Sequence, residues 1–219
     1  MARNPTKRGT TERSAQTRRR IIDVAIDVFA EHGYRGAFTR EIARRAGIHH
    51  PLIVYHFKDK LGLWRECAHT IQQDMATQVR QLLQRTAGTD ARNRLASFLT
   101  QLVENGARHT TRHRFMMWYL LDRPQVDPAS ARSALMGEGS DAWIGEVIAA
   151  QAAGVLPRTI DPVLLQYVLI GMATRLFMDP DGYFSRSGRT VTDPKVIAEQ
   201  RDTILTLLGL HPRRKRAKR

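Results

Sequence analysis

Apolar residues recur every three or four positions along most of the chain, and the stripes that they form are separated by Gly, Pro and Asp. One stripe lies in residues 21–29, and two shorter ones lie in residues 39–46 and 48–57. Residues at this spacing share one face of an α-helix, so each stripe predicts an amphipathic helix. The strict apolar–polar alternation that indicates β-strands does not occur. The pattern therefore predicts an all-α fold.

Three Asp-Pro pairs predict the starts of further helices. An Asp at the N-cap accepts a hydrogen bond from a free backbone N–H, and proline fits the first helical position because no donor is needed there. The pairs are Asp127-Pro128, Asp161-Pro162 and Asp193-Pro194. Together with a long stripe in residues 64–82 and the other apolar stripes, they predict about nine helices.

Residues 39–60 have the pattern of two short helices joined by a tight turn. Thr39 can cap the first helix, and Gly47 follows its last apolar residue, where glycine adopts the left-handed conformation without strain. Pro51 fits only the first turn of a helix, so the second helix should begin near residues 49–50. This pattern is typical of a helix-turn-helix that binds DNA. An ordinary helical hairpin with polar residues facing solvent also fits it.

The longer segment from Thr17 to Trp64 resembles the DNA-binding domain of the TetR family of bacterial regulators. Its sequence, TRRRIIDVAIDVFAEHGYRGAFTREIARRAGIHHPLIVYHFKDKLGLW, matches the family pattern without a gap. The resemblance implies a three-helix DNA-binding domain followed by a larger helical domain that binds an effector and dimerises. The predicted domains are a basic arm at 1–16, the DNA-binding domain at 17–62, the helical domain at 63–210 and a basic tail at 211–219.

The resemblance also implies a set of DNA contacts. The positions that commonly reach base edges in the family are Arg40, His50 and Pro51. Arg can bond guanine through two donors, His can donate to a purine, and a proline ring can meet a thymine methyl group. The family's phosphate contacts correspond to Thr39, Tyr55, His56 and Lys60. Such contacts fix the position on DNA without reading its sequence.

Three residues depart from the family pattern in this segment. His49 replaces the usual Ser or Thr cap, Leu52 replaces a later hydroxyl residue, and Val54 replaces an aromatic residue. The first two changes remove hydroxyl donors, and the third removes an expected tyrosine contact to phosphate. Either other groups compensate, or the affinity for each half-site is modest.

Two apolar surfaces near the C-terminus correspond to the pair of helices through which the family dimerises. The predicted interface is Leu165, Val168, Leu169, Met172, Ile204 and Leu208. A symmetric homodimer would present two reading helices to a palindromic double-stranded operator. The alternative is that these residues only complete the core of one protomer.

The resemblance further implies a pocket for a small-molecule effector between the connecting helix and the dimer helices. Ligand sites are mostly apolar, and the aromatic and Met side chains that could line one are Phe115, Met116, Trp118, Tyr119 and Trp143. A plain core cluster would contain the same residue types. The chemistry of the effector is not specified by the sequence.

Charge is concentrated at the two ends of the 219-residue chain, whose formal net charge is +14. Residues 1–20 contain seven Lys or Arg and one acid, and residues 213–219 contain six Lys or Arg and no acid, so these tails carry twelve of the fourteen charges. The polar N-terminal arm is expected to be disordered when free. Its predicted DNA contacts, in the phosphate backbone or minor groove, are Arg3, Lys7, Arg8 and Arg13. The alternative is a solvated tail with non-specific attraction.

The remaining chemistry argues against an enzyme. His49, His50 and His56 lack the spacing of a metal site, so neither a metal nor a cofactor is expected. Cys67 is the only cysteine and falls on an apolar stripe, which predicts a buried thiol and a reducing, cytoplasmic location. The sequence contains no apolar run long enough to predict a membrane span.

These observations predict a sequence-specific transcriptional regulator. The expected form is a homodimeric repressor that a small-molecule effector releases from its operator. The alternative is a non-specific nucleic-acid-binding protein that acts mainly through its basic tails.

Overall fold

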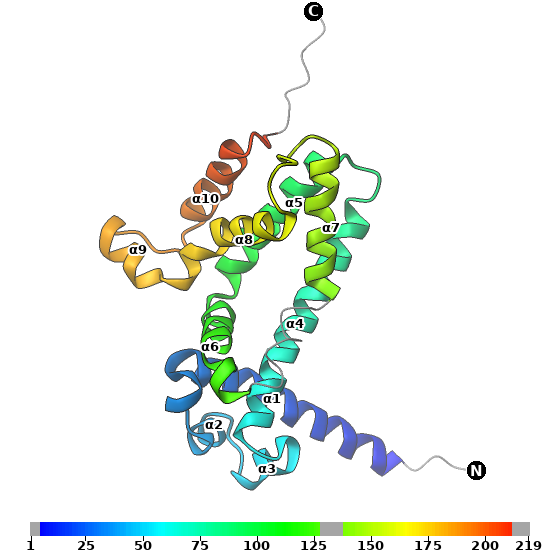
Figure 1. The fold of residues 1–219 in the computed structure, drawn as a ribbon. Helices are drawn as coiled ribbons and strands as arrows, with labels where there is room; N and C mark the ends of the chain where they lie inside the picture. Colours follow the sequence, from blue (N-terminus) through cyan, green and yellow to red (C-terminus); the bar gives the residue numbers. More distant parts are fainter. Residues whose placement is uncertain (1–4, 128–137, 212–219) are drawn as a thin grey trace, which may run out of the picture. The chain divides into compact units, whose positions relative to one another are not determined.

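The computed structural model describes residues 5–127 and 138–211, which form ten α-helices and contain no strand (Figure 1). The prediction of an all-α fold is therefore confirmed. The helices are α1 (Pro5–Gly36), α2 (Thr39–Arg45), α3 (Pro51–Phe57), α4 (Lys60–Arg85), α5 (Ala91–Arg108), α6 (Thr110–Val126), α7 (Glu138–Ala152), α8 (Pro162–Met178), α9 (Pro180–Ser187) and α10 (Pro194–Leu207).

The chain divides into two compact units whose limits differ from the predicted domains. The N-terminal unit comprises residues 1–72 and 114–132, and the C-terminal unit comprises residues 73–113 and 133–219. The first part of α4 and most of α6 therefore belong with the helix-turn-helix, not with the second domain that was predicted to begin at residue 63. The physical reason is an aromatic cluster that draws both helices onto α1.

Trp64 on α4 occupies the centre of this aromatic cluster. Its ring centroid lies 4.8 Å from that of Phe29 on α1 and 4.8 Å from that of Phe115 on α6. Tyr119, one turn further along α6, lies 5.7 Å from Trp64, and all four side chains are buried. Large aromatic side chains contribute several kcal/mol each when they are buried in this way. The sequence alone did not indicate that α6 would supply half of this cluster.

Polar contacts hold α6 and the residue after it in the same unit. The indole N–H of Trp118 donates to the carbonyl oxygen of Ala30 at 3.2 Å, and Asp122 accepts a hydrogen bond from the backbone N–H of Tyr34 at 3.2 Å. Asp127 accepts two hydrogen bonds from Arg65 on α4, at 2.6 and 2.5 Å. Asp127 was predicted to cap a helix that starts at Pro128, and this position lies outside the described residues.

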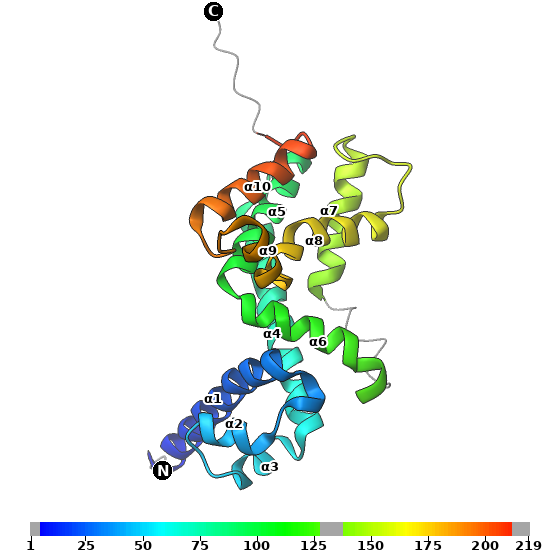
Figure 2. The same cartoon turned by 90° about the vertical axis from the view of Figure 1, so that its left-hand side faces the viewer.

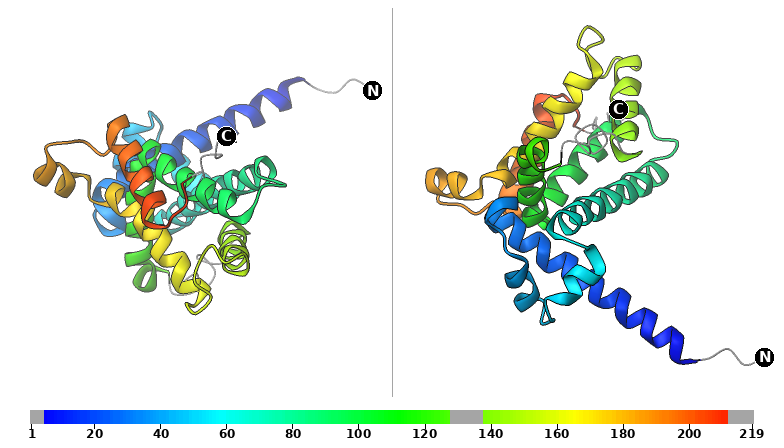
Figure 3. Two further views of the ribbon diagram at one scale, coloured as in Figure 1. Left: turned by 90° about the horizontal axis from the view of Figure 1, so that it is seen from above. Right: turned by 60° about the horizontal axis from the view of Figure 1, so that its bottom comes forward.

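Helix α1 corrects the prediction of a disordered arm. It is helical from Pro5, so residues 5–16 continue the helix instead of forming a disordered segment, and its first turns project beyond α2 and α3 (Figure 3). A helix that is already nucleated gains one backbone hydrogen bond for each residue added, and Glu12, Arg13, Ala15 and Gln16 are acceptable helix formers. Tertiary packing of residues 21–30 supplies that nucleus.

The core of the C-terminal unit forms where α5 packs against α7, α8 and α10 (Figure 2). Asp161 and Asp193 accept hydrogen bonds from the first turns of α8 and α10, as their Asp-Pro pairs predicted. A fourth pair, Asp179-Pro180, starts α9 in the same way. It was missed because the apolar stripe of α8 runs up to it without a break. None of the residues of α9 is buried.

Close packing between α5 and α8 generates a prediction for Gly106. A Cβ atom at this position would lie 2.2 Å from the Phe177 ring, and Phe177 is buried. We expect Gly106→Ala to lower the free energy of unfolding by about 1–3 kcal/mol, because the ring has no space into which to move. Gly145→Ala on α7 is the matched control, because nothing lies within 4 Å of its Cβ position.

Urea denaturation followed by circular dichroism measures both changes. The control should gain up to about 1 kcal/mol from the better helix propensity of alanine. Equal stability of the two variants would contradict the packing described for α5 and α8.

Candidate nucleic-acid interface

The turn between α2 and α3 has the geometry of a regular helix end. Gly47 adopts the left-handed conformation with φ of 61°. Its N–H donates to the carbonyl oxygen of Arg44, and the N–H of Ile48 donates to that of Ala43. These two bonds form a Schellman motif, which satisfies carbonyl groups at the end of α2 and reverses the chain. Pro51 then occupies the first position of α3, as the sequence predicted.

Apolar residues on the inner faces of α2 and α3 anchor both helices in the N-terminal unit. Ile42 and Ala43 on α2 and Ile53 and Phe57 on α3 are 5% exposed or less. The opposite side of α3 is exposed, and its residues are Pro51, Leu52, Val54 and Tyr55. Because the buried face fixes the orientation of α3, the exposed face is held available for a partner.

A hydrogen bond joins the starts of the two helices. The hydroxyl of Thr39 and Nε2 of His50 are 2.9 Å apart. Thr39 was expected to be the N-cap of α2, but Phe38 takes that position and makes no side-chain cap. The hydroxyl is therefore free to hold the imidazole of His50 at the beginning of α3. One candidate for phosphate contact thus positions one candidate for base contact.

Ion pairing distinguishes the three arginines of α2. Arg44 donates two hydrogen bonds to Glu41, at 2.8 and 2.7 Å. Arg45 donates to Glu41 at 2.7 Å and to both carboxylate oxygens of Glu31 on α1 at 2.8 Å. Arg40 is exposed and has no acidic partner among the described residues. Of these three guanidinium groups, that of Arg40 is the one left available for an outside ligand.

The predicted phosphate contacts differ in exposure. Tyr55 is 77% exposed and lies at the outer face of α3, while His56 is half-buried with its ring centroid 5.0 Å from that of Tyr55. The ammonium group of Lys60 lies 4.6 Å from the centre of the Tyr34 ring, and its burial lowers the pKa of Lys60. Lys60 is therefore held against α1 by a cation–π contact.

The departures His49, Leu52 and Val54 all lie on the exposed side of the motif. Of the predicted arm residues, Arg13 is exposed on α1, and Lys7 and Arg8 lie in its first turns. Arg3 lies outside the described residues.

The residues predicted for an effector pocket are divided between the two units. Phe115, Met116, Trp118 and Tyr119 belong to the N-terminal unit, and Trp143 belongs to the C-terminal unit. Trp143 stacks on Phe98 with a centroid distance of 4.9 Å. Phe115, Tyr119 and Trp143 are buried core residues. Aromatic composition could not separate core from pocket, because both environments favour the same side chains.

The predicted dimer residues divide between the interior and the surface of the C-terminal unit. Leu165, Leu169 and Ile204 are buried in the core of the protomer itself, which corrects their assignment to an interface. Val168 is 49% exposed, and Met172 and Leu208 are partly buried. Other exposed apolar residues of these two helices are Val163, Leu164 and Tyr167 on α8 and Leu207 on α10. An alternation of exposed and buried apolar positions cannot be read from a helix that is apolar on every side.

The described residues also bear on the other chemistry considered. The thiol of Cys67 is buried, and its Sγ atom lies 3.8 Å from the carbonyl oxygen of Ile22. Burial raises the pKa of Cys67. Residues 5–127 and 138–211 contain no group of three His, Cys, Asp or Glu side chains that could hold a metal ion. Within the same ranges, no helix combines the length and hydropathy needed to cross a bilayer.

A buried three-helix scaffold that presents the outer face of α3 defines the protein as a helix-turn-helix DNA-binding protein. Two family models extend this assignment. Residues 21–67 match the bacterial regulatory proteins of the tetR family, and residues 94–208 match the tetracyclin repressor-like C-terminal domain. The chain therefore belongs to the TetR family, and it is a DNA-binding transcriptional regulator and not an enzyme.

Similar proteins cover parts of the sequence. The HTH-type transcriptional activator FasR of Mycolicibacterium smegmatis is 35% identical over 89 residues, which are 41% of this chain and 40% of FasR. The HTH-type transcriptional regulator BetI of Cronobacter sakazakii is 33% identical over 109 residues, which are 48% of this chain and 50% of BetI. The matched segments thus span half or less of these relatives.

A likeness in fold extends over most of the chain. The crystal structure of the transcriptional regulator FadR from Bacillus subtilis, in complex with stearoyl-CoA, has a TM-score of 0.61 and 18% sequence identity. The match covers 86% of this chain and 96% of that chain. At this identity, the comparison establishes a shared fold.

The ion pairs of α2 generate a prediction for the titration of Glu41. Hydrogen bonds from Arg44 and then Arg45 lower the pKa of Glu41 from 4.5 to about 2. Because the folded-state pKa lies below the ordinary one, the interaction stabilises the fold above pH 4.5 and is lost as the pH falls toward 2. Carbon-13 NMR of the Glu41 carboxyl group should show this low midpoint.

Arg45→Ala should move the titration midpoint of Glu41 back toward 4.5, because one donor to the carboxylate is lost. Arg40→Ala is the control, since Arg40 lies on the same helix and the hydrogen bonds to Glu41 described above come from Arg44 and Arg45. A midpoint near 4.5 in the unaltered protein would show that these ion pairs do not form in solution.

Proposed function

We propose that the protein is a homodimeric repressor that recognises a palindromic operator and is released from it by a small-molecule effector. The observation that carries this proposal is the state of α2 and α3. Arg40 has no acidic partner among the described residues, Thr39 holds His50 in place, and Pro51 is exposed at the start of α3. These groups are ready to bind base edges without first breaking internal ion pairs.

A homodimer is supported by the apolar surface on α8. Leu164, Tyr167 and Val168 are 57%, 59% and 49% exposed, and Leu207 on α10 is 71% exposed. A contiguous group of large apolar side chains favours burial against a second protein surface. A two-fold axis through this surface would bring two copies of α3 to an operator with two matching half-sites.

Release by an effector is supported by the chain connections and by a structural neighbour. Helix α4 begins in the N-terminal unit, which contains the helix-turn-helix, and ends in the C-terminal unit. A ligand that favours one position of α4 therefore changes the position of the helix-turn-helix through a continuous helix. The FadR structure, which shares the fold, contains stearoyl-CoA. We propose a small-molecule effector for this chain on that basis. We also propose that the protein acts in the cytoplasm, where it binds DNA.

Arg40→Ala and His50→Ala test the assignment of base contacts. Each variant should lower the affinity for the operator, found by footprinting the region upstream of the protein's own gene, by about tenfold to a hundredfold. Loss of one good base contact costs about 1–3 kcal/mol. Fluorescence anisotropy with operator and scrambled DNA measures the effect, and Arg186→Ala, an exposed arginine on α9, controls for the loss of one charge.

The alternative of non-specific binding predicts a different result in the same assay. If the basic tails dominate, operator and scrambled DNA bind with equal affinity, and Arg40→Ala changes neither affinity.

We propose that the N-terminal arm adds only electrostatic affinity for DNA. A chain that begins at residue 15 should therefore keep its preference for the operator while its affinity becomes less dependent on salt, and an unchanged salt dependence would exclude a contribution from the arm.

Val168→Asp tests the dimer surface. A carboxylate at this position would face its symmetry mate in a dimer, so the dimer should dissociate at least about tenfold more readily. Sedimentation velocity measures the change. Ile148→Asp on α7 is the matched control, because Ile148 is also 49% exposed. A dimer that is unaffected by Val168→Asp would place the interface elsewhere.

A further inference from the structure

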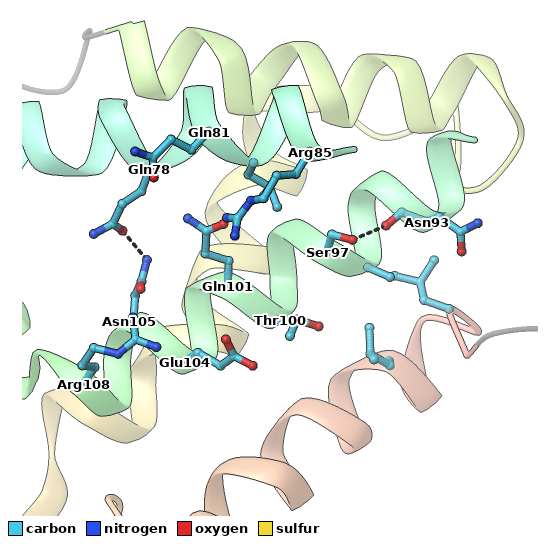
Figure 4. Close-up of a pocket in the computed structure, with 14 residues that line it drawn as sticks. Gln78, Gln81, Arg85, Asn93, Ser97, Thr100, Gln101, Glu104, Asn105 and Arg108 are labelled. Carbon is cyan, nitrogen blue, oxygen red and sulfur yellow. Dashed lines mark hydrogen bonds between the residues drawn. The ribbon is translucent and has the colours of Figure 1, made fainter. Parts of the chain in front are cut away.

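The C-terminal unit has a groove that is lined by none of the residues predicted for the effector pocket. It is formed by α4, α5 and the end of α10, and its volume is about 870 Å³ (Figure 4). Small-molecule sites commonly have volumes of about 300–1,000 Å³ and mostly apolar walls. This groove is of that size, but most of its lining side chains are polar. Its occupant should therefore be polar as well.

The groove is built from two helix faces of regular spacing. On α4 the lining residues are Gln78, Gln81, Leu82 and Arg85, which share one face. On α5 a polar stripe runs almost the full length of the helix, from Asn93 to Arg108. Leu205 and Leu210 provide apolar contacts on the α10 side. Helix α5 is amphipathic, and its polar face lines the groove.

Gln101, at the middle of the α5 stripe, has an unsatisfied acceptor. Its Oε1 atom is buried and meets no hydrogen-bond donor within residues 5–127 and 138–211. The corresponding acceptor of Gln78 is satisfied, since Asn105 donates to Oε1 of Gln78 across the groove. Figure 4 shows Gln101 directed toward α4 and Arg85 directed toward Gln101. A buried acceptor without a donor is costly, so a ligand with an N–H or O–H group would be stabilised here.

The charged groups of the groove favour an anion. Arg85 and Arg108 are exposed, and no carboxylate in the described parts of the chain pairs with either of them. Glu104 is the acidic residue of the lining, and it also interacts with Arg201 on α10. The two arginines therefore leave a net positive charge along the groove. Guanidinium groups bind phosphate and carboxylate through paired donors.

We propose that this groove binds a small anionic molecule that also carries N–H or O–H donors. Arg85 and Arg108 bind its phosphate or carboxylate groups, and Oε1 of Gln101 accepts a hydrogen bond from its donor. The ligand joins the C-terminal part of α4 to α5. Its effect on operator binding rests on the proposed function, but its binding to the groove does not.

Isothermal titration calorimetry of the full-length protein without DNA tests the site. The probes are AMP, which offers a phosphate, L-glutamate, which offers carboxylates, and adenosine, which offers donors without an anion. At least one of the two anions should bind saturably, and adenosine should bind at least tenfold more weakly than the anion that binds. Arg85→Ala and Arg108→Ala should each weaken binding tenfold or more, and Gln101→Leu several-fold.

Arg186→Ala is the control for charge, and a thermal melt of each variant shows whether it is folded. No saturable binding of either anion at about 10 mM would overturn the proposal. Binding that persists unchanged in Arg85→Ala and Arg108→Ala would overturn the assignment to this groove, and equal binding of adenosine and AMP would overturn the anionic class. The proposed function is tested separately, because Arg40→Ala affects operator binding and leaves the groove intact.

Discussion

Burial of Trp64 between Phe29 and Phe115 is the interaction on which the rest of the structure depends. It brings α1, α4 and α6 together in the N-terminal unit, because the Trp64 ring centroid lies 4.8 Å from the centroids of both Phe29 and Phe115. Helix α4 starts in the N-terminal unit and continues into the C-terminal unit. Helix α6 starts in the C-terminal unit and ends in the N-terminal unit. The DNA-binding unit therefore has two continuous helical connections to the unit in which we propose that ligands bind.

Competition for acidic partners determines which cations of the helix-turn-helix are available to DNA. Glu41 binds Arg44 and Arg45 within α2, and the second ion pair of Arg45, with Glu31, holds α2 to α1. Arg40, one residue into the same helix, has no such partner among the described residues. The same argument applies to the groove in the C-terminal unit, where Arg85 and Arg108 have no carboxylate partner within residues 5–127 and 138–211 and favour an anion. In both places, the arginine that does not pair with a described acidic residue is the one available to an outside ligand.

Local signals in the sequence predicted much of the fold. Asp161 and Asp193 begin helices because an Asp-Pro pair satisfies a helix start without tertiary help. The turn at Gly47 follows from local backbone chemistry in the same way. The candidate base contacts came from the family resemblance; Arg40 and Pro51 are exposed, and His50 is half-buried beside Thr39. The prediction failed for residues 5–16, where polar composition suggested disorder but α1 extends from a packed segment.

The sequence by itself determined the all-α class, most helix starts and the helix-turn-helix, because periodicity, caps and turns depend on neighbouring residues. Only the tertiary structure decided which apolar residues face inward. On α8, Leu165 and Leu169 enter the core while Leu164 and Val168 remain exposed, although the four are chemically alike. It also decided that Phe115 is core and that the polar stripe of α5 lines a groove. These outcomes depend on which helix packs against which, and that information is not local.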